Sequence, residues 1–102
     1  MKTIGTHNYY VYILTNKTKT VMYTGVTNDL KRRLLFHREN TNLKRRAFNS
    51  KYKCFYLIYY ECFSFVKDAI KREKQIKGWL RIKKEKLIDE FNPEWKFLNN
   101  EI

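Results

Sequence analysis

Five side chains in this sequence carry groups that could do chemistry together: two phenols, a guanidinium, an imidazole and a carboxylate. They belong, in chain order, to Tyr12, Tyr23, Arg33, His37 and Glu73. A site that cuts a phosphodiester needs a base that takes a proton from water, cations that hold the phosphate and an anion that holds a metal ion. The set therefore predicts hydrolysis of a polyanionic substrate.

The charge balance favours the same class of substrate. The 102 residues include 22 Lys and Arg against 10 Asp and Glu, which gives a net charge of +12. This favours nucleic acid first and an anionic membrane surface second, although many basic residues can simply solvate a surface. No apolar run approaches the roughly 20 residues of a membrane span, and no apolar signal segment follows Met1. We expect a cytoplasmic protein with nucleic acid as partner, no membrane contact and no dedicated protein partner.

The alternation and spacing of apolar residues predict one α+β domain with helices against a small three-stranded, largely antiparallel sheet. The expected strands cover residues 9–15, 21–26 and 53–63, and the expected helices cover residues 29–39, 64–77 and 80–91. The order is therefore β-β-α-β-α-α. Residues 1–7 are expected to form a flexible arm, residues 8–97 the domain and residues 98–102 a tail.

Three details of this prediction can be checked separately. The third strand is apolar on both faces, which favours the covered centre of the sheet. Ser64 is expected to cap the helix that follows. Cys54 and Cys62 are expected to be half-buried free thiols on one face of the third strand, too far apart for a disulfide. The two cysteines and the two histidines, His7 and His37, do not have the spacing of a zinc site.

The elements would bring the candidate groups together. By strand parity, Tyr12 and Tyr23 are near neighbours across a hairpin, and Gly25 allows a backbone or ligand to come close. Tyrosine is also a favoured strand residue, so plain packing explains the pair equally well. Arg33 and His37 are one helical turn apart, although Arg33 also ends a run of three cations that could be a solvated face.

Glu73 falls on the apolar stripe of its predicted helix, where a carboxylate is costly unless it is paired or bound to a metal ion. Lysines and arginines on the neighbouring turns leave an ordinary i,i+4 ion pair open as the simpler interpretation.

The ordered set of motifs resembles the GIY-YIG nuclease superfamily, and within it the small stand-alone domains. The two family tripeptides correspond to Tyr10-Val11-Tyr12 and Tyr23-Thr24-Gly25. The steps from Tyr12 to Tyr23 and on to Arg33 and His37 are similar to the family pattern, as is the segment 69–77 around Glu73. Asn92-Pro93-Glu94-Trp95 resembles the closing motif of the stand-alone members. Val26 departs from the pattern, since several family nucleases carry a lysine there.

The resemblance implies a metal-dependent endonuclease, acting on DNA more than RNA, with Mg²⁺ (or Mn²⁺) held by Glu73. Tyr12 would be the base, Tyr23 would line the site, Arg33 would stabilise charge on the phosphate, and His37 would tune or relay the proton of Tyr12. The residues expected to contact nucleic acid are Lys31, Arg32, Lys44, Arg45, Arg46 and Asn92. The sequence is compatible with a role in DNA repair, in a mobile element or in RNA turnover.

A tyrosine base sets a physical condition on this mechanism. With an unperturbed pKa of about 10, only ~0.1% of a phenol is ionised at pH 7. We therefore expect Arg33, a nearby metal ion and the overall positive charge to lower the pKa of Tyr12, which requires that Tyr12 and Arg33 be close.

Two other functions fit the same sequence. One is a non-catalytic nucleic-acid-binding module, in which basic residues hold phosphates and exposed tyrosines stack on bases. The other is a protein-interaction domain whose basic surface suits an acidic partner or a membrane face. Cleavage that depends on a metal ion and on Glu73 distinguishes the nuclease from both.

Overall fold

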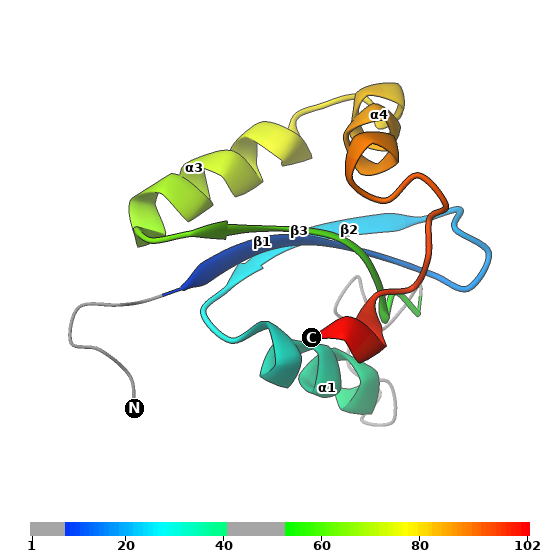
Figure 1. Ribbon diagram of the computed structural model, residues 1–102, viewed down its shortest axis with the longest axis horizontal. Coiled ribbons are helices and arrows are strands. Elements are labelled where there is room, and N and C mark those ends of the chain that lie inside the picture. The colour runs from blue at the N-terminus through cyan, green and yellow to red at the C-terminus, as the bar shows by residue number, and fades with distance from the viewer. Residues whose placement is uncertain (1–7, 41–52) are drawn as a thin grey trace.

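A three-stranded antiparallel sheet in the order β2-β1-β3 forms the middle layer of the protein. The computed structural model describes residues 8–40 and 53–102, without the side chains of 36–40. Its elements are β1 (Tyr9–Thr15), β2 (Met22–Thr27), α1 (Leu30–Asn40), β3 (Tyr56–Phe63), α3 (Val66–Lys77), α4 (Arg81–Phe91) and the short helix η2 (Asn99–Glu101). Helices α3 and α4 cover one face of the sheet, while α1 and η2 lie on the other (Figure 1). The predicted α+β fold and element order are confirmed.

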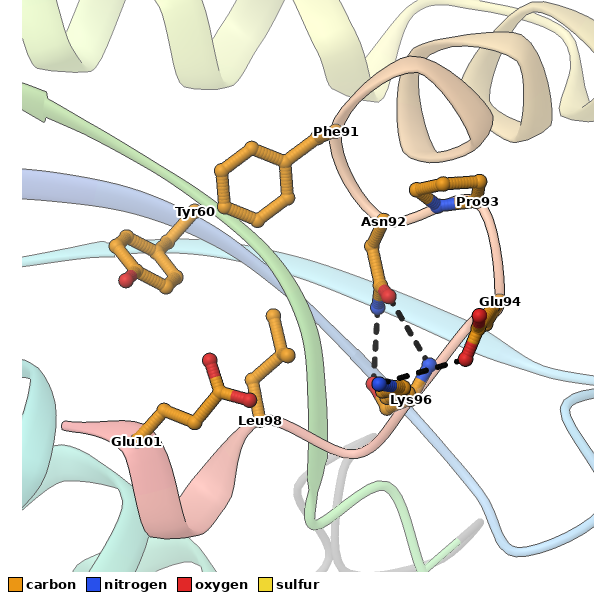
Figure 2. A pocket seen from close by; sticks show the side chains of 8 residues that line it. All are labelled: Tyr60, Phe91, Asn92, Pro93, Glu94, Lys96, Leu98 and Glu101. Carbon is orange, nitrogen blue, oxygen red and sulfur yellow. Dashed lines mark hydrogen bonds and ion pairs between the residues drawn. The ribbon is translucent and has the colours of Figure 1, made fainter.

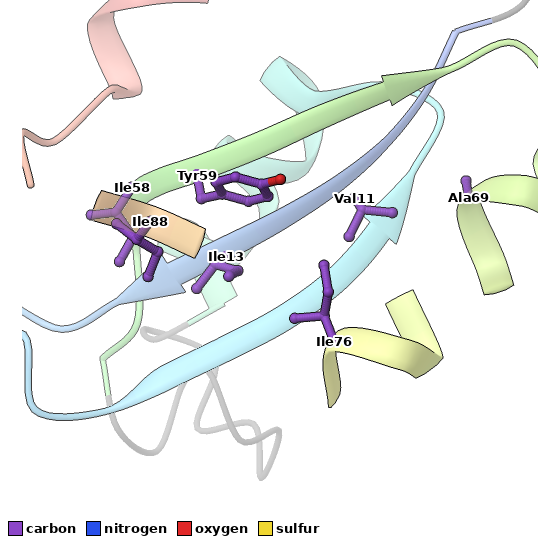
Figure 3. Close-up of a cluster of buried hydrophobic side chains, with 7 residues drawn as sticks. All are labelled: Val11, Ile13, Ile58, Tyr59, Ala69, Ile76 and Ile88. Atoms are coloured by element: carbon purple, nitrogen blue, oxygen red, sulfur yellow. The ribbon is translucent and has the colours of Figure 1, made fainter. Parts of the chain in front are cut away.

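The central strand β1 supplies side chains to a hydrophobic cluster on each face, because successive residues of a strand point to opposite sides. Val11 and Ile13 face α3 and α4, where they join the cluster drawn in Figure 3. Tyr12 and Leu14 face α1 and pack with Leu30 and other residues. Every residue from position 11 to 15 is buried, so β1 is held between the two helical layers.

The expected central position of the third strand is wrong, because β1 is the centre and β3 forms an edge. Both faces of β3 are apolar because helices cover both faces of the whole sheet. Its outer edge is also bonded by the end of the chain: the Leu98 amide donates to the Leu57 carbonyl at 2.7 Å, and the Asn99 side-chain oxygen accepts from the Leu57 amide at 2.9 Å. A register shift opposite Ile13 and Leu14 then places both Ile58 and Tyr59 in the α3/α4 cluster.

The last residues of the chain belong to the packed domain. Leu98 is buried in the cluster on the α1 side, and Ile102 packs against the same cluster. The ordered unit therefore extends past the predicted boundary at residue 97, while the predicted arm at 1–7 lies outside the described residues. No helix in the described segments is long and apolar enough to cross a membrane.

The helix ends agree with the sequence in one case and differ in another. Asp29 directly precedes α1 and caps it, because its side-chain oxygen accepts a hydrogen bond from the Arg32 amide at 3.1 Å. The expected cap by Ser64 is wrong. Helix α3 starts at Val66 after an extended Phe65, and no side chain caps it.

The two cysteines lie in different environments, which gives a simple test of the fold. Neither forms a disulfide, but Cys54 is buried and precedes β3, whereas Cys62 is exposed. Burial raises the pKa of the Cys54 thiol to about 11. Since the thiolate is the reactive form, we expect iodoacetamide to label one thiol in the folded protein and both after unfolding. The variant Cys62→Ser should leave the folded protein unlabelled; rapid labelling of that variant would contradict the packing around Cys54.

Candidate active site

The ring of Tyr12 lies directly over Gly25, its partner on the neighbouring strand. Tyr12 pairs with Gly25 and Tyr23 pairs with Leu14, so the two tyrosines meet diagonally, with ring centroids 6.4 Å apart. A Cβ atom at position 25 would stand 2.5 Å from the Tyr12 hydroxyl oxygen. Glycine is required here because the phenol occupies the space that a side chain would fill.

Two helices on opposite faces of the sheet bring opposite charges to this phenol. The half-buried Arg33 of α1 lies close enough to the Tyr12 hydroxyl to lower its pKa, and the Glu73 carboxylate of α3 raises the pKa of the same hydroxyl. Because α1 and α3 lie on opposite sides of the sheet (Figure 1), the site spans the sheet next to the edge strand β2. The structure thus brings together four of the five groups predicted from the sequence: Tyr12, Tyr23, Arg33 and Glu73.

The pKa of Tyr12 is shifted in the direction opposite to the one expected. Burial, the largest cause, raises the pKa well above its usual range, and the neighbouring Tyr23 and Glu73 raise it further. Arg33 lowers it, but by less than burial raises it. Only 1% of the Tyr12 surface is exposed, so loss of solvation of the phenolate outweighs one favourable cation.

Glu73 is both inward-facing and ion-paired, as the simpler interpretation of its sequence position predicted. It is 8% exposed and belongs to the buried side of α3. Lys77, one turn later, places its Nζ atom 2.5 Å from Glu73 Oε2. The spacing of four residues is the sequence signal for this partner, but a sequence shows several such lysines and does not say which one reaches the carboxylate.

The donor set around Glu73 suits a metal ion that keeps most of its water ligands. Among residues 8–35 and 53–102, no group of three or more His, Cys, Asp or Glu side chains could form a cage. Mg²⁺ is commonly bound through one or two carboxylates, with water and substrate phosphate completing its shell. A single buried carboxylate, with an arginine acting on the same phenol, fits that arrangement.

Several predicted site residues are placed only in part. His37 lies in α1, but its side chain is outside the described structure, and so are Lys44, Arg45 and Arg46. Lys31 and Arg32 are exposed on the first turn of α1, as a phosphate contact requires.

Asn92 has a structural role in place of the expected contact with nucleic acid. It is 6% exposed, and its amide nitrogen donates to the Ile58 carbonyl at 3.1 Å and to the Lys96 carbonyl at 2.9 Å. Its side-chain oxygen accepts from the Lys96 amide at 3.1 Å (Figure 2). These bonds close the turn after α4 and hold the C-terminal segment on β3. The nearby cavity of about 270 Å³ is lined by none of the four assembled site residues.

Known proteins share these features of sequence and fold. The model of the GIY-YIG catalytic domain matches residues 8–86. The chain belongs to the GIY-YIG family. Among its GIY-YIG relatives, the UPF0213 protein of Bacillus pumilus is 34% identical over 88 residues, which cover 86% of each chain. That of Haloquadratum walsbyi is 33% identical over 82 residues, covering 80% of this chain and 88% of the relative.

A solved structure of another family member has the same architecture. The solution NMR structure of the UPF0213 protein from Bacillus halodurans is similar to this one with a TM-score of 0.50 at 34% identity. The match covers 80% of this chain and 83% of the other. The sequence motifs therefore identified the GIY-YIG family correctly.

The close approach of Tyr12 to Gly25 predicts an unequal response of two glycines. Gly25→Ala should destabilise the protein by about 1–3 kcal/mol, because the new methyl group displaces a packed ring. Gly78→Ala is the control. Gly78 has a right-handed helical conformation, and a Cβ there would meet its nearest atom at 3.6 Å, so we expect no loss, or a gain of about 0.4–1 kcal/mol. Urea unfolding measures both, and equal effects would contradict the geometry described.

Proposed function

We propose that this GIY-YIG protein is a metal-dependent endonuclease that hydrolyses phosphodiester bonds, in DNA more readily than in RNA. The observation that supports this most is the meeting of a phenol, a guanidinium and a buried carboxylate at one place, supplied by β1, α1 and α3. Each group matches one requirement of the reaction: a base, a phosphate clamp and a metal ligand. The net charge of +12 favours a polyanionic substrate.

Each side chain has one task in the proposed reaction. Tyr12 takes a proton from the attacking water, and Tyr23 lines the site and hydrogen-bonds the water or the phosphate. Arg33 stabilises the negative charge that develops on the phosphate. Glu73 would hold Mg²⁺ or Mn²⁺, which when bound supplies Lewis-acid polarisation of the phosphate. His37 is proposed to relay the proton of Tyr12.

The raised pKa of Tyr12 makes charge neutralisation at Glu73 part of this proposal. The Glu73 carboxylate is one of the groups that raise the pKa of the phenol, whereas Arg33 lowers it. If the charge of Glu73 is neutralised, the Arg33 guanidinium is left as the main charge acting on Tyr12. Holding a cation at Glu73 would therefore also lower the pKa of Tyr12 and raise the fraction of Tyr12 that is ionised and able to accept a proton.

Cleavage of labelled DNA and RNA in single-stranded, duplex, flap and junction forms, with Mg²⁺, Mn²⁺ or EDTA, tests the proposal directly. We expect metal-dependent cutting that Glu73→Gln lowers by about 100-fold or more. Glu85→Gln is the matched control, because Glu85 also forms an i,i+4 ion pair, with Arg81 at 2.8 Å on α4. Tight, salt-sensitive binding without cutting would instead indicate the non-catalytic binding module.

The pH dependence of cutting tests Tyr12 as the base. Since its pKa lies above the usual value, the active phenolate becomes more abundant as pH rises. We expect the single-turnover rate to rise up to about tenfold per pH unit from about pH 6 to 9, without a plateau. Tyr12→Phe should lower the rate by about 100-fold or more and leave the melting temperature within a few degrees.

Tyr59→Phe is the control for removing a buried hydroxyl. Tyr59 is also buried with a raised pKa, but its hydroxyl donates to Glu61 and its ring belongs to the α3/α4 cluster. The Tyr59→Phe protein should therefore cut nucleic acid at the wild-type rate. A fully active Tyr12→Phe protein would rule out the base assignment.

A further inference from the structure

The carboxylate proposed to hold a metal ion already has a cation beside it. Lys77 Nζ lies 2.5 Å from Glu73 Oε2, which is the contact expected of Glu and Lys four residues apart on a helix. The two side chains differ sharply in exposure: that of Glu73 is 10% exposed and that of Lys77 is 54% exposed. The pair therefore consists of a fixed, buried anion and a cation that reaches it from solvent.

This asymmetry decides which partner can leave. A buried carboxylate without a counter-charge is costly, so Glu73 needs a cation in every state of the protein. Lysine is a compact charge on a flexible stem that can keep its head in water. Its departure from Glu73 therefore requires little rearrangement, provided another cation takes its place.

We propose that Lys77 is the resident counter-ion of Glu73, that a divalent cation displaces it, and that the displaced ammonium then contacts a substrate phosphate. This inference rests on the proposed function, because it assumes that Glu73 is the metal ligand. A divalent cation and an ammonium at the same carboxylate oxygen repel each other strongly, so occupancy by one excludes the other.

The second half of the proposal follows from the anchoring of Lys77. Its backbone is one helical turn from Glu73, so the freed ammonium stays beside the site. Arg33 approaches the site from α1, on the opposite face of the sheet. A phosphate held at this site would then meet the Arg33 guanidinium and the Lys77 ammonium, both of which are good phosphate partners.

Binding of Mn²⁺ alone, measured by electron paramagnetic resonance of the free ion without nucleic acid, tests the displacement. We expect Lys77→Met to bind Mn²⁺ about five- to tenfold more tightly than wild type, because the competing charge is gone. Lys77→Gln should behave in the same way and serves if the Met variant does not fold. Lys74→Met removes another exposed lysine of α3 and should change the affinity less than about twofold.

The outcomes separate this inference from the proposed function. Equal Mn²⁺ affinities for wild type and both Lys77 variants, all lost on Glu73→Gln, would overturn the displacement and leave the metal role of Glu73 standing. Absence of any Glu73-dependent Mn²⁺ binding in all variants would overturn both.

Salt dependence of nucleic-acid binding tests the phosphate contact. The affinity of wild type and of Lys77→Met for labelled duplex DNA is measured over a range of salt concentrations. The divalent ion in these measurements is Ca²⁺. The slope of log affinity against log salt should be smaller in magnitude by about 0.9 for Lys77→Met. In EDTA the slopes should be equal, because Lys77 is then held by Glu73. Equal slopes in Ca²⁺ would overturn the phosphate contact.

Discussion

The position of the site depends on the contact between Tyr12 and Gly25. Tyr12 belongs to the central strand, whose neighbours on both sides are strands and whose faces are covered by helices. A side chain from such a strand would ordinarily end in the core. Because position 25 has no Cβ atom, the phenol extends over the edge strand β2. There it is close enough to interact with Arg33 from one face of the sheet and Glu73 from the other.

Burial gives the site its electrostatic character. It raises the pKa of Tyr12 and at the same time makes an unpaired Glu73 carboxylate unfavourable. Two cations offset these effects separately: Arg33 lowers the pKa of the phenol, and Lys77 forms an ion pair with the carboxylate. The arrangement is stable in the folded protein, yet it keeps the phenol neutral. Under the proposed function, a substrate and a divalent cation would change both balances at once, and binding would thereby be linked to ionisation of Tyr12.

Local sequence rules predicted the parts of the site that depend on local structure. The hairpin of β1 and β2 has a regular register, so parity placed Tyr12 and Tyr23 on one face, and helical spacing placed Arg33 and Glu73 on their elements. Apart from the cap expected at Ser64, the failures involve segments distant in sequence. The outer edge of β3 is bonded by Leu98 and Asn99, more than 40 residues after Leu57. The sign of the Tyr12 pKa shift depends on how deeply the packed elements bury one ring.

Charge argues against the cavity shown in Figure 2 as the binding site for a polyanion. That cavity carries Tyr60 and Phe91 together with the carboxylates of Glu94 and Glu101, and Lys96 is paired with Glu94 at 3.4 Å. A polyanion would meet repulsion there. The candidate site offers the half-buried Arg33 and the exposed Lys77 instead. A phosphate chain is bound along its length and needs an open, positively charged surface more than a deep pocket, so for this class of substrate the sign of the charge decides between the two places.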